Sequence, residues 1–297
     1  MKFALFLGCT VPARGLNYEL SARNVAEKLG IELVDILEFT CCGFPIRSLN
    51  QDAGFLMAAR NLAMAEKQGL NVVTLCSACT ETLQEANYHF IHNPGALDDT
   101  NKKLVKYNLE YKGTVIVKHF ARMLHEDYGI DNIKEKVVRP LDEIQVAAHY
   151  GCHYTKPTQI YDNYDDPENP HSLDELIEVT GAKSLFYREK DKCCGGAILG
   201  IREIDSLKMS RAKLDGAIEA KADALISICP FCSVMYEGNQ KRIEKEFEVT
   251  YKLPVLYYPQ LLGLALGIEP IDLGFKLNRI KAKALLEKLK SEPEPVT

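Results

Sequence analysis

All ten cysteines of the chain fall into two copies of one spacing pattern. The first copy has the spacing C-x31-CC-x33-C-x2-C and the second has C-x40-CC-x34-C-x2-C, with no cysteine left over. Each copy supplies five soft ligands, and thiolates in this number favour iron–sulfur chemistry. The first set comprises Cys9, Cys41, Cys42, Cys76 and Cys79, and the second comprises Cys152, Cys193, Cys194, Cys229 and Cys232.

A disulfide framework is a poor explanation of these cysteines. Residues 1–9 carry one lysine and an apolar run too short for a signal-peptide core, with no small-residue cleavage site. We therefore expect a cytoplasmic protein, in which thiols persist as thiols or as metal ligands. A direct bridge within Cys41-Cys42 would also be strained. A single cysteine could still be a small buried hydrophobe, but that explains the duplicated sets poorly.

Charge and hydropathy argue against nucleic-acid binding and against a membrane-spanning helix. The formal net charge is -5 and the sequence pI is about 5.9, which argues against a nucleic-acid-binding surface. No apolar run approaches the ~20 residues that a membrane-spanning helix needs. We therefore expect neither a nucleic-acid partner nor a membrane span.

The duplication extends beyond the cysteines. An apolar run and a glycine precede the first cysteine of each set, and each vicinal pair is followed by glycine. Residues 72–76 resemble 225–229, and residues 111–117 resemble 251–257. The repeat predicts a first half at residues 1–140, a second half at 141–274, and a C-terminal helix and tail at 275–297.

Short apolar segments alternate with helical patterns within each half. We expect strands at residues 3–7, 32–37 and 71–75, and helices at 17–29, 55–67 and 207–220. This alternation predicts an α/β fold of two pseudo-symmetric Rossmann-like halves with parallel sheets. Cys9, Cys42 and Cys76 then lie at or just beyond the carboxyl ends of strands, the edge where such sheets bind ligands.

Two other segments carry weaker signals. Residues 161–171, YDNYDDPENPH, read as a loop inserted after Cys152, either covering the site or lying on the surface. Residues 275–290 have helical spacing and are expected to serve packing or contact between subunits. The last residues, SEPEPVT, are expected to be frayed.

Zinc is the main alternative to iron as the bound metal. Structural zinc takes four ligands, often from two C-x2-C pairs, whereas each set here has one such pair, a vicinal pair and a lone cysteine. Five thiolates exceed a tetrahedral shell. An ordinary [4Fe-4S] cluster also takes four cysteines, usually at other spacings. The fifth thiolate indicates a spare cysteine or an unusual cluster.

The two frames, with Cys41-Cys-Gly and Cys193-Cys-Gly, resemble the duplicated CCG domain of the B subunit of CoB–CoM heterodisulfide reductase from methanogenic archaea. The resemblance covers residues 1–270. It implies one noncubane [4Fe-4S] cluster in each half. It also implies that the five cysteines of the first set bind one cluster and that the five cysteines of the second set bind the other.

The CCG domain also occurs in proteins with other tasks. Relatives include iron–sulfur subunits of hydroxy-acid oxidation systems and subunits of fumarate- or succinate-linked complexes, in which the domain is an electron relay. Many of these carry a ferredoxin-like segment, and no C-x2-C-x2-C-x3-C-P occurs before Cys9 or after Cys232. We therefore favour the heterodisulfide reductase type and keep the relay as the alternative.

The implied reaction reduces the disulfide CoM-S-S-CoB to two thiols with two electrons and two protons. Since every cysteine is assigned to metal, no thiolate is left for thiol–disulfide exchange. We hypothesise that the two clusters face one another and each supplies one electron. His153, which follows Cys152, is the candidate proton donor, or else a histidine that only hydrogen-bonds a cluster sulfur. His119 and His149 are expected to be core residues.

Both ends of that substrate are anionic, so basic residues near the cysteines are candidate anchors. They are Arg14, Arg47, Lys156, Arg188 and Arg202. No G-x-G-x-x-G fingerprint is present, so electrons are expected from a partner. The resemblance implies two heterodisulfide reductase partners, the iron–sulfur C subunit of that enzyme together with its flavin-containing and iron–sulfur A subunit. It links them to a hydrogenase or a formate dehydrogenase in a bifurcating complex.

Overall fold

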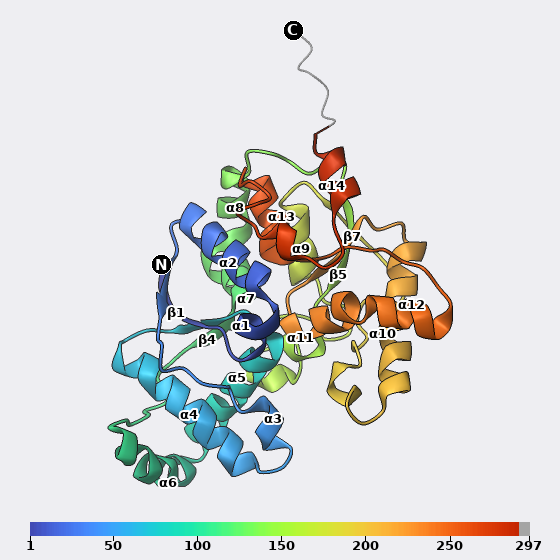
Figure 1. Cartoon of the computed structure of the whole chain (residues 1–297). Helices are drawn as coiled ribbons and strands as arrows, with labels where there is room; N and C mark the ends of the chain where they lie inside the picture. Colours follow the sequence, from blue (N-terminus) through green and yellow to red (C-terminus); the bar gives the residue numbers. More distant parts are fainter. Residues whose placement is uncertain (291–297) are drawn as a thin grey trace.

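The computed structural model describes residues 1–290 and contains two four-stranded sheets flanked by helices (Figure 1). The first sheet has the strand order β2-β1-β3-β4 and the second has the order β6-β5-β7-β8, and all pairings are parallel. The strands are β1 (Lys2–Phe6), β2 (Glu32–Asp35), β3 (Val72–Thr74), β4 (Val117–His119), β5 (Gln145–His149), β6 (Lys183–Leu185), β7 (Ala224–Ser227) and β8 (Val255–Tyr257).

The identical strand order confirms the predicted fold of two pseudo-symmetric α/β halves. The central strands β3 and β7 are buried along their whole length. Strands buried on both faces read as continuous apolar runs, as these do. The expected domain limits at residues 140 and 274 stay predictions.

Helices connect the strands within each half. The chain of the first half runs through α1 (Thr10–Arg14), α2 (Leu16–Lys28), α3 (Phe44–Arg47), α4 (Gln51–Lys67), α5 (Ser77–His92), α6 (Pro94–Leu104), α7 (Phe120–Met123) and α8 (Ile130–Lys136). The remaining helices are α9 (Ser172–Glu178), α10 (Glu203–Glu219), α11 (Pro230–Ser233), α12 (Gln240–Phe247), α13 (Tyr258–Ala265) and α14 (Lys283–Lys288). No helix within residues 1–290 is both long and apolar enough to cross a bilayer.

The predicted strands and helices are present, with shifted ends. Helix α4 begins at Gln51, one turn before the expected start, because the Asn50 side chain accepts a hydrogen bond from the Ala53 amide and caps the helix. Helix α10 likewise begins earlier than expected, at Glu203. The expected helix starts were based on the spacing of apolar residues, which does not take account of helix capping.

The prediction of one C-terminal helix over residues 275–290 is wrong. The chain forms a 3₁₀ turn at Phe275–Leu277 and then α14, with extended backbone at Asn278 between them. The buried Asn278 amide donates to the Val255 carbonyl of β8 and pairs with Gln260 of α13. These tertiary hydrogen bonds outweigh the helical preference of the local sequence. The tail predicted to fray, residues 291–297, lies outside the described residues.

The two halves share their hydrophobic cores. Helix α2 of the first half packs against α13 of the second, and the two lie side by side in Figure 1. The ring of Tyr18 on α2 stacks on Tyr257 at 4.1 Å. The Tyr18 hydroxyl and the His119 ring, both from the first half, hydrogen-bond the Ile228 carbonyl at 3.0 and 2.9 Å. The first half therefore fixes the backbone immediately before Cys229 of the second.

His119 gives a pH-dependent contribution to this junction. Complete burial lowers the pKa of His119 to about 4, from 6.5 for an exposed imidazole. The unfolded chain therefore binds the proton at higher pH than the folded chain. We expect this group to lower the free energy of unfolding by about 1.4 kcal/mol per pH unit as the pH falls from about 6.5 to 4.

Urea unfolding of the wild type and of His119→Gln at pH 7.5, 6.5 and 5.5 measures this effect. The variant should lose this part of the acid destabilisation, because glutamine does not titrate. The exposed His92 supplies the control, and His92→Gln should keep the wild-type slope. An unchanged slope in His119→Gln would contradict the prediction.

Candidate metal centre

The cysteines lie where strands give way to helices at the carboxyl edges of the two sheets. Cys9 follows β1 and caps α1, and Cys76 follows β3 and caps α5. In the second half, Cys229 follows β7 and caps α11. A helix N-terminus favours the thiolate form of a cysteine. The predicted placement of the cysteines at strand ends is therefore confirmed.

Within each set the sulfur atoms contact one another. In the first set, the Cys42 thiol hydrogen-bonds Cys41 and Cys79, and Cys79 hydrogen-bonds Cys76. In the second set, Cys193 hydrogen-bonds Cys152 and Cys194, and Cys232 joins Cys194 to Cys229. All ten cysteines are free of disulfide bonds.

The two sets also meet each other. The Cys76 thiol of the first set hydrogen-bonds the Cys229 thiol of the second. Gly151, whose φ of +77° favours glycine, lies between the halves here, since a Cβ at this position would be 3.3 Å from the Ser77 hydroxyl of the first half and 3.5 Å from the Cys229 Cβ. The five-cysteine sets are therefore neighbours across the junction between the two halves.

The contacting sulfurs share protons unequally. Hydrogen bonds from Cys41 and Cys79 hold the pKa of the Cys42 thiol well below its usual value, while the Cys42 sulfur raises the pKa of Cys79. In the second half, contact with Cys152 and Cys194 lowers the pKa of Cys193. Neighbouring thiols of a set therefore titrate as coupled groups.

Such a donor set fits a cationic metal core. Neighbouring thiolates repel one another, and bound metal ions remove that repulsion by displacing the remaining protons. Within residues 1–290, no group of three or more His, Cys, Asp or Glu side chains is arranged to hold a single metal ion. The thiolates of an iron–sulfur cluster bind different irons and need not converge on one point.

A cavity of about 730 Å³ opens onto the first set. All five cysteines of that set line it, together with Ala197 and Phe231 from the second half. Phe44, Pro45 and Arg47 of α3 form part of its wall. The cavity is therefore built by both halves and is bordered by thiols, aromatic rings and one guanidinium group.

Arg47 belongs to a charged network on this wall. Its Nη1 atom binds Glu81 Oε1 at 2.7 Å and Glu85 Oε2 at 2.5 Å. Glu81 is buried, and desolvation raises the pKa of its carboxyl group although Arg47 opposes the shift. The His153 ring of the second half lies 3.5 Å from Glu81 Oε2 and edge-on to Phe44. His153 is thus held beside the cavity of the first set, as well as next to Cys152.

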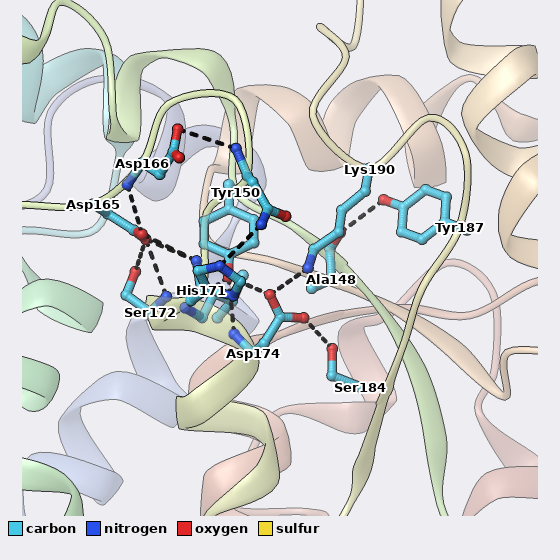
Figure 2. Close-up of polar contacts among 12 residues, drawn as sticks. Ala148, Tyr150, Asp165, Asp166, His171, Ser172, Asp174, Ser184, Tyr187 and Lys190 are labelled. Atoms are coloured by element: carbon cyan, nitrogen blue, oxygen red, sulfur yellow. Dashed lines mark hydrogen bonds and ion pairs between the residues drawn. The ribbon is translucent and has the colours of Figure 1, made fainter.

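The inserted segment 161–171 is an ordered loop beside the second set. Its residues Pro167 and Pro170 line a small hollow with Cys152 and Lys156. Figure 2 shows how Asp165 holds the loop by accepting hydrogen bonds from the His171 amide and from Ser172. Of the two interpretations of this insertion, the structure favours the one in which it covers the site.

The segment leading to Cys193 is held by a second set of contacts in Figure 2. Asp174 of α9 accepts from the Tyr150 hydroxyl at 2.5 Å and also binds Ser184 and Lys190. The Tyr187 hydroxyl donates to the Ala148 carbonyl of β5 at 2.7 Å. These contacts tie the approach to the vicinal pair to the neighbouring strand and helix.

The other predicted basic residues lie away from the cysteine cavity. The Arg188 side chain is 91% exposed and pairs with Glu189, and Arg202 is exposed and pairs with Asp205. Arg14 is exposed at the end of α1 and is not part of the cavity wall. The structure thus brings Arg47 and Lys156 to the two cysteine sets, and the roles of all five residues stay predictions.

Three buried polar residues near the second set were missed by the sequence analysis as site residues. Lys213 of α10 is fully buried, and burial lowers its pKa to about 8. His149 is a core residue as expected, but neither ring nitrogen has a hydrogen-bond partner. The buried Tyr236 hydroxyl also has none. Aligning the two halves on their cysteines would have singled out these positions.

Comparison with known proteins places the chain in a family. The family model described as a cysteine-rich domain, CCG, matches residues 3–84 and 146–237. The B subunit of ferredoxin:CoB-CoM heterodisulfide reductase from Methanosarcina mazei is 36% identical over 97% of both chains. The membrane anchor subunit of 8-methylmenaquinol:fumarate reductase from Wolinella succinogenes is 32% identical over 96% of this chain and 99% of its own.

A solved structure supports the fold. A hypothetical protein from Helicobacter pylori superposes with a TM-score of 0.78 over 94% of this chain at 20% identity. This chain spans about half of that protein, 52% of its length. At this identity the similarity concerns the fold alone.

Gly43 gives a test of the backbone that carries the first vicinal pair. It has a φ of +103°, and a Cβ would lie 2.7 Å from the Gly54 carbonyl oxygen of α4. We expect Gly43→Ala to lower the free energy of unfolding by about 3 kcal/mol, from backbone strain together with the clash. The Cys41-Cys42 loop should shift and bind less iron.

Gly69→Ala is the matched control. Gly69 also has a positive φ, +67°, but nothing lies within 4 Å of an added Cβ. It should cost roughly 1 kcal/mol and leave iron content unchanged. Anaerobic urea unfolding and iron analysis of both variants measure the difference. Equal effects in the two variants would show that the Gly54 contact does not matter.

Proposed function

Because the chain belongs to the cysteine-rich CCG-domain family, we propose that it is the disulfide-reducing subunit of a heterodisulfide reductase. The substrate in this proposal is CoM-S-S-CoB, and the products are the thiols of coenzyme M and coenzyme B. One observation carries the proposal most directly. Two complete five-cysteine sets meet at Cys76 and Cys229, next to a cavity walled by both halves.

The cysteines fit two iron–sulfur clusters, one per set, and this fit rests on the donor chemistry. Each set offers five thiols, of which four in the first set and all five in the second are hydrogen-bonded to one another, and metal can displace their protons. We propose that both clusters are [4Fe-4S] and noncubane, with the first and second sets as their ligands. When bound, they supply electrons, one each, to the sulfur–sulfur bond.

The chain's own residues would bind the anionic ends of the substrate. Arg47 uses only Nη1 for its two carboxylate partners, which leaves its other guanidinium N–H groups for an anion at the cavity. Lys156 lies beside Cys152 on the second half. We propose these two residues as the anchors, because the other three candidates, Arg14, Arg188 and Arg202, are exposed and lie away from the cavity.

His153 would deliver protons to the product thiols. Its ring lies between the Glu81 carboxyl group and Phe44, at the wall of the cavity. Imidazole is suited to proton transfer near neutral pH. The Glu81 oxygen 3.5 Å from Nδ1 would orient the ring. The alternative role, a hydrogen bond to a cluster sulfur only, predicts a shifted potential and no change in proton transfer.

Electrons would come from the other polypeptides of a complex. We propose the iron–sulfur C subunit of heterodisulfide reductase together with its flavin-containing and iron–sulfur A subunit, supplied by a hydrogenase or a formate dehydrogenase. The support is the similarity over 97% of both chains to a protein named as part of such a reductase. The cytoplasmic localisation expected from the sequence stays a prediction.

An electron-relay protein is the second candidate. Its support is the 32% identity to a fumarate reductase membrane anchor subunit over almost the whole chain. A relay would hold the same clusters but would pass electrons to another polypeptide of its complex and leave the heterodisulfide unreduced.

The experiment that separates the two uses anaerobically purified full-length chain. With reduced benzyl viologen as donor, the protein should reduce CoM-S-S-CoB on its own. Cys42→Ala and Cys194→Ala should each lose about one cluster's iron and more than about 100-fold in rate, since each removes a metal ligand. Iron-loaded wild type that oxidises no viologen with heterodisulfide present would favour the relay. Full activity after loss of one cluster would contradict the two-cluster scheme.

His153→Asn tests the proton donor. We expect kcat to fall by roughly 100-fold, the range for removal of a general acid, with KM and iron content unchanged. The exposed His171 on the inserted loop is the control, and His171→Asn should change none of the three. Unchanged kcat in His153→Asn would remove this residue from the mechanism.

A further inference from the structure

The two halves differ at three positions around their cysteine sets. His149 and Phe6 each stand three residues before the first cysteine of a set. Lys213 and Asn61 each follow the vicinal pair by 19 residues. Tyr236 and Leu83 each follow the last cysteine by four. The second half thus has a basic, an imidazole and a phenol side chain where the first half has an amide and two apolar groups.

Lys213 is a buried cation without a carboxylate partner. Its side chain is 0% exposed, and its Nζ donates to the Lys190 carbonyl at 3.0 Å. The Tyr187 ring lies 5.5 Å from Nζ, and no ion pair to Lys213 occurs within the described residues. Burial of an ammonium group away from water is strongly unfavourable unless an anion compensates the charge. The charged groups that act on Lys213 most strongly are Cys232 and Cys194, ahead of Asp191 and Glu189.

His149 and Tyr236 add unused hydrogen-bonding groups on the same side. The His149 ring, 1% exposed, stands edge-on to Tyr236 at 4.8 Å, and both interact electrostatically with cysteines of the second set, Cys229 for His149 and Cys194 for Tyr236. Among the protein groups of residues 1–290, neither ring nitrogen of His149 has a hydrogen-bond partner, and the Tyr236 hydroxyl has none either. Buried polar groups are rarely left unpaired. Their arrangement indicates an acceptor that belongs in the second site.

The first half has no such groups. Phe6 packs against Phe39 at 5.1 Å, and Leu83 is fully buried. The side-chain amide of Asn61 is already hydrogen-bonded to nearby backbone: it accepts from the Thr40 amide and donates to the Cys41 carbonyl. The charge of Arg47 near Cys42 is offset by two carboxylates, Glu81 and Glu85. The first site is therefore the more apolar and less positive of the two.

We propose that Lys213, His149 and Tyr236 make the iron–sulfur centre of the second half the easier of the two to reduce. This inference rests on the proposed function, since it requires a cluster in each set. Reduction adds one negative charge, which a nearby buried cation and hydrogen-bond donors stabilise. The first electron that reaches the pair would therefore reside mainly in the second half.

The test is an anaerobic redox titration of the full-length protein followed by electron paramagnetic resonance. The wild type should reduce in two separate steps. Lys213→Asn, which installs the residue of the first half, should lower the potential of the higher step. The expected shift is about tenfold in the distribution of an electron between the centres, or about 59 mV for a one-electron couple. Lys208→Asn, an exposed change on the same helix, should move neither step.

His149→Phe and Tyr236→Leu provide independent variants in case Lys213→Asn does not fold. Each should lower the same step, and resonance Raman in D2O should show loss of a deuterium-sensitive iron–sulfur band where a hydrogen bond has been removed. Combining the three changes should bring the two potentials together. Iron and sulfide analysis accompanies every sample, and iron-free wild type would overturn the proposed function as well.

Three results would overturn this inference while leaving the proposed function intact. The first is iron-loaded wild type whose two centres have equal potentials. The second is a shift of the lower step, and not the higher one, in the variants. The third is an unchanged titration in variants that fold and bind iron.

Discussion

The contact between the Cys76 and Cys229 sulfurs is the constraint on which the site depends. Each cysteine stands two residues beyond the end of a central strand, β3 or β7, at the carboxyl edge of its own sheet. Tyr18 and His119 hold the Ile228 carbonyl, so the first half determines where Cys229 stands. Because α2 and α13 share a core, the two sheets cannot separate without exposing buried apolar surface. The packing between the two halves therefore determines how close the Cys76 and Cys229 thiols lie.

Duplication gives the chain two similar sites, and local substitution makes them different. The backbone repeats closely, since Gly43 and Gly195 both have positive φ and approach carbonyls of α4 and α10, respectively. The side chains around the sulfurs do not repeat. A symmetric frame can thus place two metal centres side by side, while residues such as Lys213 set their electrostatic surroundings apart. Paired centres of unequal potential give electron transfer a direction, which suits either an enzyme or a relay.

Much of this arrangement could be predicted from the sequence, because the intervals between cysteines match the length of strand–helix–strand units. The rim position of Cys9, Cys42 and Cys76 followed from that spacing. The C-terminal helix was predicted wrongly, because the hydrogen bonds that interrupt it at Asn278 come from distant residues. The link from His153 to Glu81 and the burial of Lys213 depend on how the halves pack, and no local pattern reports that.

Anomalous X-ray scattering at the iron absorption edge, from crystals of the full-length chain grown without oxygen, tests the central claim most directly. The account predicts two separate iron centres, one bonded to the sulfurs of each set, on either side of Cys76 and Cys229. The two centres together should contain about eight irons, four per cluster. Iron in only one set, or a single zinc ion in each, would contradict it.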